Sequence, residues 1–168
     1  MEVITPELIA TEQVTVPASS NVWTEEQMDF GVRFPVAAMI NECEISWQPA
    51  VAGGFTLENR WAAAISLSSL SNISQGPDIN SAALLQSVLS IWEEGAATSV
   101  AILGTNGLWR RDWYQLETQA RPFAIGTLQV AGENTGTVGE SALVSFVVRY
   151  QLVRLAAEEF ASIRAALP

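Results

Sequence analysis

Alternating apolar and polar side chains are the feature that most limits the fold of this chain of 168 residues. Successive side chains of a β-strand point to opposite faces, so a period of two predicts a half-buried strand. Strand-like patterns occupy residues 36–47, 57–68, 98–103, 113–117, 123–130 and 143–155. In the first segment one face would carry Ala37, Met39, Cys43, Ile45 and Trp47. Strands at this spacing, separated by turns rich in Gly, Pro and Asn, are typical of an antiparallel β-sandwich or jelly roll.

Two segments have a helical pattern instead. The apolar residues of the first segment fall at i, i+1, i+4, i+5 and i+8, and they are Leu84, Leu85, Val88, Leu89 and Trp92. Those of the second segment share one stripe, and they are Ala156, Phe160, Ile163 and Leu167. The sequence therefore predicts a mainly β fold with one inserted helix and a short C-terminal helix over residues 156–167.

The N-terminal segment differs from the rest. We expect residues 1–24 to form an extended arm and residues 25–168 to form a single jelly-roll domain, since a chain of this length usually packs one core. From Met1 to Val32 the chain carries six acids and no base. The arm would either lie across a neighbouring subunit or pair as an edge strand of its own sheet.

The charge balance argues against several kinds of partner. Eighteen acids oppose eight bases, all of them Arg, and the chain contains neither Lys nor His. Nucleic-acid binding and attraction to anionic lipid both need clustered cations, so we expect no direct contact with a genome. We also expect no transmembrane segment, because no apolar run approaches 18 residues.

The residue types also argue against catalysis. Without His the chain lacks the usual base that activates a Ser or Cys nucleophile. The single cysteine, Cys43, excludes an internal disulfide and a multi-thiolate zinc site, and we expect it to be a buried apolar residue. Glu42 and Glu44, with Glu58 across the sheet, could form a hydrolytic pair or a calcium site, but a solvated outer sheet face explains them better. We therefore predict no enzyme, no metal and no cofactor.

The run Trp109-Arg110-Arg111-Asp112-Trp113 is the most distinctive local feature. Trp and Arg are enriched at protein–protein hot spots, so this expected loop is a candidate interface. Alternatively, the two Trp anchor the loop to its own core while Asp112 pairs with an Arg, or they stack on a small ligand. Phe160 and Ile163 of the terminal helix either fold back over the sandwich or dock on a neighbour. The candidate interface residues are thus Trp109, Arg110, Arg111, Trp113, Phe160 and Ile163.

The hairpin of residues 123–155 carries a resemblance to a known family. Its Gly132-Glu133-Asn134-Thr135-Gly136 loop and long Val-rich last strand resemble the final two strands of single jelly-roll virion proteins. Chain size, the arm and the Lys- and His-free composition are similar to the small capsid subunits of membrane-containing icosahedral phages with vertical single β-barrels. The chain differs from many RNA-virus coats in lacking a basic N-terminal arm.

The resemblance implies a jelly roll with a structural role in a shell. It implies contacts with copies of itself and with other virion proteins, no catalysis, and a place in virions assembled in the host cytoplasm. It is compatible with contact with an underlying membrane or shell. Two other readings stay open: a spike, tail or cement component of a virion, and a β-sandwich module that binds carbohydrate or protein through Trp109 and Trp113.

Overall fold

The computed structural model describes residues 1–18, 23–49, 59–67, 84–94, 100–101, 108–134 and 141–166. Within these residues the strands are β1 (Glu2–Val3), β2 (Leu8–Val16), β3 (Thr24–Asp29), β4 (Val36–Pro49), β5 (Asn59–Ser66), β6 (Leu84–Glu94), β7 (Val100–Ala101), β8 (Leu108–Asp112), β9 (Phe123–Ala124), β10 (Thr127–Asn134) and β11 (Ala142–Arg154). A 3₁₀ turn, η1, spans Thr118–Ala120, and the helix α1 spans Ala157–Ala166. None of the helices in these ranges is long and apolar enough to cross a membrane.

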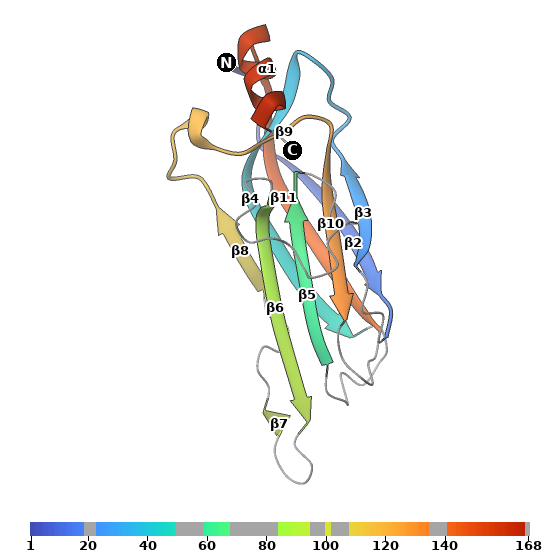
Figure 1. Ribbon diagram of the computed structural model, residues 1–168. Helices are drawn as coiled ribbons and strands as arrows, with labels where there is room; N and C mark the ends of the chain where they lie inside the picture. Colours follow the sequence, from blue (N-terminus) through green and yellow to red (C-terminus); the bar gives the residue numbers. More distant parts are fainter. Residues whose placement is uncertain are drawn as a thin grey trace.

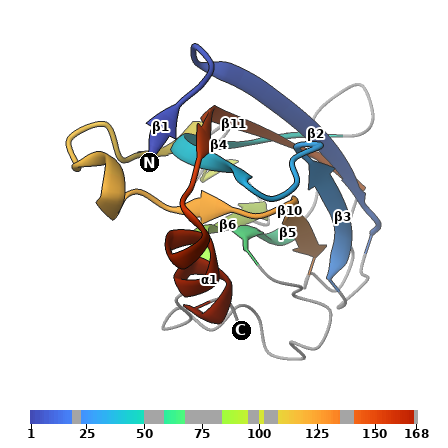
Figure 2. The ribbon, with the colours of Figure 1, turned by 90° about the horizontal axis from the view of Figure 1, so that it is seen from above.

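The strands form two antiparallel sheets that face each other (Figures 1 and 2). In the first, the β11 sheet, the order is β2-β11-β4-β8, with β1 beside β11 and β9 beside β4. In the second, the β10 sheet, it is β3-β10-β5-β6-β7. Without the two-residue strands β1, β7 and β9, eight strands remain, and they can be numbered one to eight along the chain. In this numbering the order is 1-8-3-6 in the β11 sheet and 2-7-4-5 in the β10 sheet. This interleaved order is that of a jelly roll, as the alternation pattern predicts.

β11 is the central strand of its sheet. Its 13 residues pair with β4 along one edge and with β2 and β1 along the other. Val144, Phe146 and Val148 alternate toward the core and are fully buried, which confirms the predicted last strand. The N-terminal segment thus pairs within its own sheet through β1 and β2, while the domain boundary at residue 24 stays a prediction.

A one-residue bulge divides β4 into two halves. Arg149 of β11 pairs with Glu42 but Tyr150 pairs with Ile40, so Asn41 is left over in the ladder. Because side chains alternate along a strand, the extra residue inverts which of them face the core. The prediction of one common face was wrong for this reason. Cys43, Ile45 and Trp47 lie in the main core between the sheets, whereas Ala37 and Met39 join a second cluster with Phe123, Val153 and Leu155.

The predicted inserted helix is also wrong. Residues 84–94 form β6, which pairs antiparallel with β5 from Leu84 to Trp92. The ladder with β5 therefore outweighs the local helical spacing, because strand formation depends on cross-strand neighbours more than on local preference. Asp78 or Asn80 would have capped the start of such a helix and Gly95 would have ended it, but all three lie outside the described residues.

Three smaller differences concern strand positions. The strand expected at residues 113–117 lies instead at Leu108–Asp112, and Trp113 begins a turn closed by the Leu116 N–H donating to the Trp113 carbonyl at 3.0 Å. β3 was not expected, since Met28 is its only apolar residue. Of the strand expected at residues 98–103, β7 covers Val100–Ala101, and the rest lies outside the described residues.

The two sheets approach closely where β10 passes β2. Gly132 is buried there, and a Cβ built on it would lie 2.4 Å from Val16 Cγ2 and 3.3 Å from Val144 Cγ2. Since real Cβ contacts are never that short, only glycine fits this crossing without moving its neighbours. The helix α1 lies at one end of the sandwich (Figure 2). Phe160 and Ile163 pack there on the second cluster, which is the first of the two alternatives that the sequence left open.

Candidate assembly surface

The Trp-Arg run lies on an edge strand rather than in a loop. β8 pairs with β4 in the register Ile45 to Trp109, Glu44 to Arg110 and Cys43 to Arg111. β8 ends its sheet, and among the described residues no strand pairs with its outer edge (Figure 1). The run therefore displays alternating side chains along an edge.

Both tryptophans of the run contact the protein's own core. Trp113 belongs to the main core and is 8% exposed, and Trp109 is partly buried against the same cluster. The Trp113 N–H donates to the Asn41 carbonyl at 2.8 Å, which fixes the end of β8 at the bulge. Arg111 lies 5.2 Å above the Trp113 ring in a cation–π contact and is exposed. The two arginines and Asp112 are therefore the exposed part of this run.

Glu42 is the centre of a buried ion cluster on the outer face of the β11 sheet. Its side chain is 1% exposed and accepts hydrogen bonds from Arg149 Nε at 3.1 Å and from the Arg110 guanidinium. The expected solvated face is thus wrong for Glu42, because two arginine side chains cover the carboxylate. Arg110, the first arginine of the Trp-Arg run, thus pairs with Glu42.

Glu44 shares this environment. Burial raises the pKa of its carboxyl group, and a hydrogen bond and charge repulsion from Glu42 raise it further. No group of three or more His, Cys, Asp or Glu in the described ranges could hold a metal ion, and Glu58 lies outside those ranges. Glu42 is held by two arginines and Glu44 bonds to Glu42, so the group is a structural ion cluster.

Asn41 organises a second polar network that sequence analysis missed. The Asn41 side-chain Nδ2 donates to the Glu7 carboxylate at 2.9 Å, and its side-chain Oδ1 accepts from the Arg121 guanidinium at 2.8 Å. The Tyr114 hydroxyl donates to the same Glu7 carboxylate at 2.7 Å. Burial, followed by this bond and the charge of Glu7, raises the pKa of Tyr114 to about 12. The network ties the turn after β8 and the residue before β2 to the bulge. In the sequence, a polar Asn within the apolar strand 36–47 was the one feature that could have indicated such a network.

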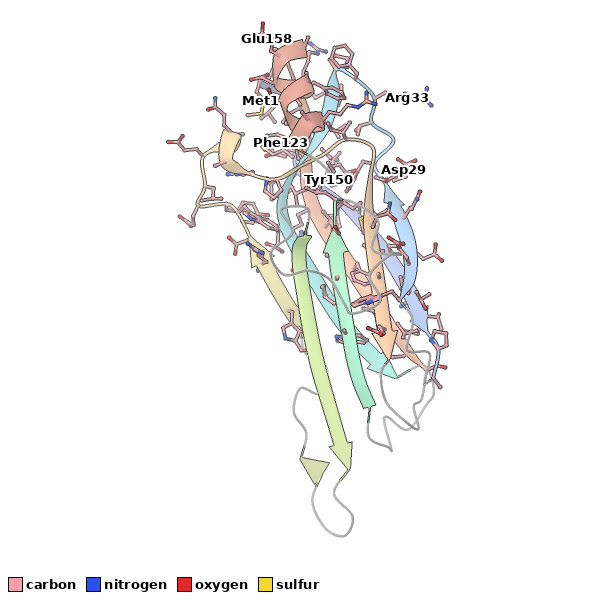
Figure 3. The ribbon with its side chains drawn as sticks, viewed as in Figure 1. Met1, Asp29, Arg33, Phe123, Tyr150 and Glu158 are labelled. Atoms are coloured by element: carbon pink, nitrogen blue, oxygen red, sulfur yellow. The ribbon has the colours of Figure 1, made fainter. Side chains whose placement is uncertain are left out.

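The other two candidate residues lie at the end of the sandwich that α1 covers. Phe160 meets Phe34 edge to face, with ring centroids 5.0 Å apart, and Phe34 is 57% exposed. Figure 3 shows Met1, Phe123 and Glu158 together at this end. The six candidate residues thus form two groups, one on and beside β8 and one on α1.

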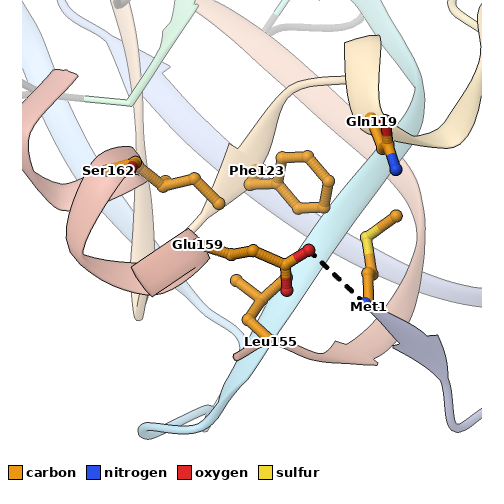
Figure 4. Close-up of a pocket in the computed structure, with 7 residues that line it drawn as sticks. Met1, Gln119, Phe123, Leu155, Glu159 and Ser162 are labelled. Atoms are coloured by element: carbon orange, nitrogen blue, oxygen red, sulfur yellow. Dashed lines mark hydrogen bonds and ion pairs between the residues drawn. The ribbon is translucent and has the colours of Figure 1, made fainter. Parts of the chain in front are cut away.

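A pocket of about 400 Å³ opens beside α1 (Figure 4). Phe123, Leu155 and Ile163 contribute its apolar wall, and Glu159 lies at its rim. Glu159 accepts the Ala156 N–H at 2.8 Å, which lowers the pKa of its carboxyl group, and it lies 3.4 Å from the Met1 ammonium. These bonds hold the first turn of α1 against the sheet.

Cys43 is buried, as predicted. Desolvation raises the pKa of its thiol well above the ordinary range, so the reactive thiolate is suppressed at neutral pH.

Comparison with known proteins supports the fold. No known protein family matches this chain, and no curated protein matches it in sequence. Among solved structures it is similar to VP1 of trichodysplasia spinulosa-associated polyomavirus in complex with GM1 oligosaccharide, with a TM-score of 0.55 and 10% identity over 92% of this chain and 99% of that one. A chain of desmodium yellow mottle tymovirus also matches, at 7% identity over 90% and 91% of the two chains, but its TM-score of 0.36 carries no weight. The similarity to VP1 establishes a shared jelly-roll fold.

Proposed function

We propose that this protein is a structural subunit of a virion, which assembles with copies of itself and with other virion proteins into a capsid shell. The observation that carries the proposal is the complete jelly roll, which matches the capsid protein VP1 over nearly the full length of both chains. In this role the protein acts through its shape, because complementary surfaces on neighbouring subunits fix the spacing of subunits in the shell. Each stable contact would bury at least roughly 1,000 Å².

The chemistry of the described residues supports a structural role. The conspicuous polar groups are used internally: Glu42 is held by two arginines, and Asn41 ties three segments together. Such locked groups stabilise a shape and leave no paired acid and base for proton transfer.

We further propose the more specific place that the sequence suggests, as a small capsid subunit of a membrane-containing icosahedral phage with vertical single β-barrels, assembled in the host cytoplasm. A net charge of −10 and an acidic N-terminal segment support a position over a membrane or protein layer better than one against a genome. The spike, tail or cement role uses the same fold and is separated by copy number.

A module that stacks carbohydrate on Trp109 and Trp113 has weaker support. A sugar needs an open aromatic face, and Trp113 is only 8% exposed. The carbohydrate named with VP1 belongs to that protein, and nothing in the exposure of this Trp pair favours a similar ligand here.

The test is assembly of the purified chain. Light scattering after size exclusion, followed by negative-stain microscopy, should reveal oligomers or shells, alone or after addition of co-expressed virion proteins. Mass spectrometry of purified particles should find the chain in many copies. A monodisperse monomer at high concentration, together with absence from particles, would refute the proposal.

A further inference from the structure

We infer that two copies of this chain join end to end about a two-fold axis, each inserting its loop residues Arg33 and Phe34 into a groove beside α1 of the other. We call these two residues the 33–34 knob. The inference rests on the proposed function, because it names a contact through which two subunits meet. Its basis is that one end of the sandwich carries both an acidic groove with an apolar wall and an exposed aromatic ring beside a cation.

The first observation is the groove. The pocket of about 400 Å³ beside α1 adjoins a second pocket of about 420 Å³, and Met1 and Gln119 line both of them. They form one groove with two lobes, which we call the end groove. The apolar wall described above belongs to the first lobe (Figure 4), and Glu117 lies in the second. Since ligand pockets begin at about 300 Å³, each lobe has room for a large side chain.

The end groove is acidic. Glu117 is exposed, and within the described part of the chain its carboxylate makes no hydrogen bond or ion pair. Glu159 is already held by the Ala156 N–H and the Met1 ammonium. No side chain among the described residues that line the groove is a base. The groove therefore suits a segment in which an apolar side chain adjoins a cation.

The second observation is the 33–34 knob, which lies at the same end of the molecule. Figure 3 shows Arg33 and Met1 at the end that α1 covers. Phe34 is 57% exposed, and one edge contact with Phe160 of α1 orients its ring. Phe34 is not among the described residues that line the groove of its own chain. The knob and the groove are thus separate features of one end.

The backbone of the knob is held on both sides. The Arg33 carbonyl accepts the Val36 N–H at 2.8 Å, and the Pro35 carbonyl accepts the Leu155 N–H at 2.9 Å. A segment that is ordered before it binds loses little conformational freedom on binding. These bonds therefore favour association through the knob.

Arg33 is an available cation, unlike most of the arginines. It is exposed and makes no hydrogen bond or ion pair with the residues that the structure describes. The engaged arginines are Arg110 and Arg149 on Glu42, Arg111 over Trp113, Arg121 on Asn41, and Arg154 on Glu2. Arg164 is also exposed, but it follows Ile163, which packs on its own sandwich. Among the described side chains Arg33 is therefore the available cation that adjoins an exposed apolar residue.

The other exposed large apolar side chains lack such a neighbour, and they are Met1, Val3, Ile4, Ile9, Tyr114 and Leu116. Ile9 lies beside Arg149, which Glu42 already holds. Leu116 precedes Glu117 and would bring a second carboxylate to an acidic groove. Phe34 is therefore the exposed apolar residue whose neighbour complements the groove in charge.

These charges select one pairing at this end. Groove against groove would oppose Glu117 to its own copy, and knob against knob would oppose Arg33 to its own copy, and like charges across an interface are unfavourable. Knob into groove buries Phe34 in the apolar lobe and brings Arg33 to Glu117. Because both features lie at one end, a two-fold axis makes the contact twice and closes the dimer.

The absence of Lys from the chain allows a direct test. Arg33→Lys supplies the only side-chain amine, and a zero-length carbodiimide joins an amine to a carboxylate in contact with it. Equal amounts of ¹⁴N and ¹⁵N protein would be mixed, allowed to exchange, cross-linked and digested. We expect mixed-isotope peptide pairs that join position 33 to Glu117. Arg154→Lys is the matched control: its partner Glu2 lies in the same chain, so its links should carry one isotope only.

The dissociation constant of the dimer, measured by analytical ultracentrifugation, provides a second readout. Phe34→Ala should raise it roughly tenfold, because the burial of an exposed ring is lost. Arg33→Glu and Glu117→Arg should each raise it by a similar factor, and the double variant should return within about threefold of the unaltered chain. Ile9→Ala removes an equally exposed apolar side chain from β2 and should change little. Circular dichroism verifies the fold of each variant.

The outcomes separate the contact from the function. A chain that stays monomeric at high concentration but occurs in many copies in particles overturns the contact and leaves the structural role intact. Dimers that link position 33 to carboxylates other than Glu117, or that ignore the single substitutions, also overturn the contact.

Other occupants of the groove, or of the surface that the knob meets, give distinct results. Links from position 33 only to a co-assembled virion protein overturn the second copy as the partner. Flotation with phosphatidylcholine vesicles that depends on Phe34, in place of dimerisation, overturns it in favour of a lipid surface. A dimer with the expected links, from a chain that is absent from particles, refutes the proposed function and leaves the contact.

Discussion

The outer face of the β11 sheet has two halves that differ sharply, although both are built from the same two strands. On one side of Asn41, Glu42 is covered by Arg110 and Arg149. On the other side, Met39 lies in an apolar cluster closed by α1. A single extra residue in β4 separates them. The comparison teaches that one bulge lets a strand serve two different environments, because it reverses the faces for all residues beyond it.

The apolar half should be the more sensitive to truncation. Met39→Ala removes a side chain that is 1% exposed and should lower the free energy of unfolding by about 3 kcal/mol, from lost burial and a cavity. Urea denaturation measures this. Val147→Ala, on the partly exposed outer face of the polar half, should cost less than about 1 kcal/mol. Equal costs would remove the contrast between the two halves.

The polar half should depend on its ions as a unit. Arg149→Met leaves Glu42 buried with Arg110 alone, and we expect a loss of about 2 kcal/mol, below the cost of a fully orphaned charge. Arg154→Met, which breaks a pair with both side chains exposed, should change stability by less than about 0.5 kcal/mol. In a double-mutant cycle that combines Arg149→Met with Glu42→Gln, the losses of unfolding free energy from the two single variants should not add. Strict additivity would show that the cluster is not cooperative.

The bulge itself should be held by its side-chain network. Asn41→Ala deletes bonds to Glu7 and Arg121 and should cost about 1–2 kcal/mol. Amide hydrogen exchange should also accelerate at Trp113, whose N–H donates to the Asn41 carbonyl. Tyr114→Phe removes only the bond to Glu7 and should have a smaller effect on both measurements. Unchanged exchange at Trp113 in Asn41→Ala would mean that the backbone holds the bulge without this network.

The smallest expected effect concerns pH. The folded state raises the pKa of Glu44, so it binds that proton more tightly than the unfolded chain does. The stabilisation is therefore complete below the unfolded pKa of about 4.3 and is lost as pH rises through the raised value. Glu44→Gln does not titrate, so its stability relative to the unaltered chain should increase from about pH 4 to pH 7, by less than 1 kcal/mol because solvent screens this site.

Denaturant titrations across this pH range measure the difference. In a Glu42→Gln background it should shrink, because the hydrogen bond and charge of Glu42 are causes of the raised pKa. A difference that decreases toward neutral pH would show that Glu44 is stabilised as an anion.

Sequence reasoning succeeded where one face of an element is buried along its whole length. β11 and α1 are examples, since Val144, Phe146 and Val148 alternate without interruption and Phe160 and Ile163 share a stripe. It failed where the secondary structure of a segment depends on pairing with strands that are distant in the sequence. β6 has helical spacing but pairs with β5, and β3 has only Met28 to reveal it. In β4 the period of two is real on each side of Asn41, but sequence alone does not reveal that the phase changes there.

The candidate surface was predicted in composition but not in form. The Trp-Arg run was recognised, yet its role as an edge strand depends on pairing with β4, which lies far away in sequence. The burial of Glu42 likewise depends on Arg149 and Arg110, from two other strands. Contacts of this kind leave no local signature.

The central place of β11 has a consequence for how the chain reaches its native state. β2 and β4 pair with β11 along opposite edges, but β11 follows them on the order of 100 residues later in the sequence. Until the ribosome has released β11, the earlier strands lack their common neighbour and this layer cannot close. Such high contact order slows folding. The acidic N-terminal segment repels the same segment of other nascent chains, and this repulsion opposes aggregation before β11 is available to pair.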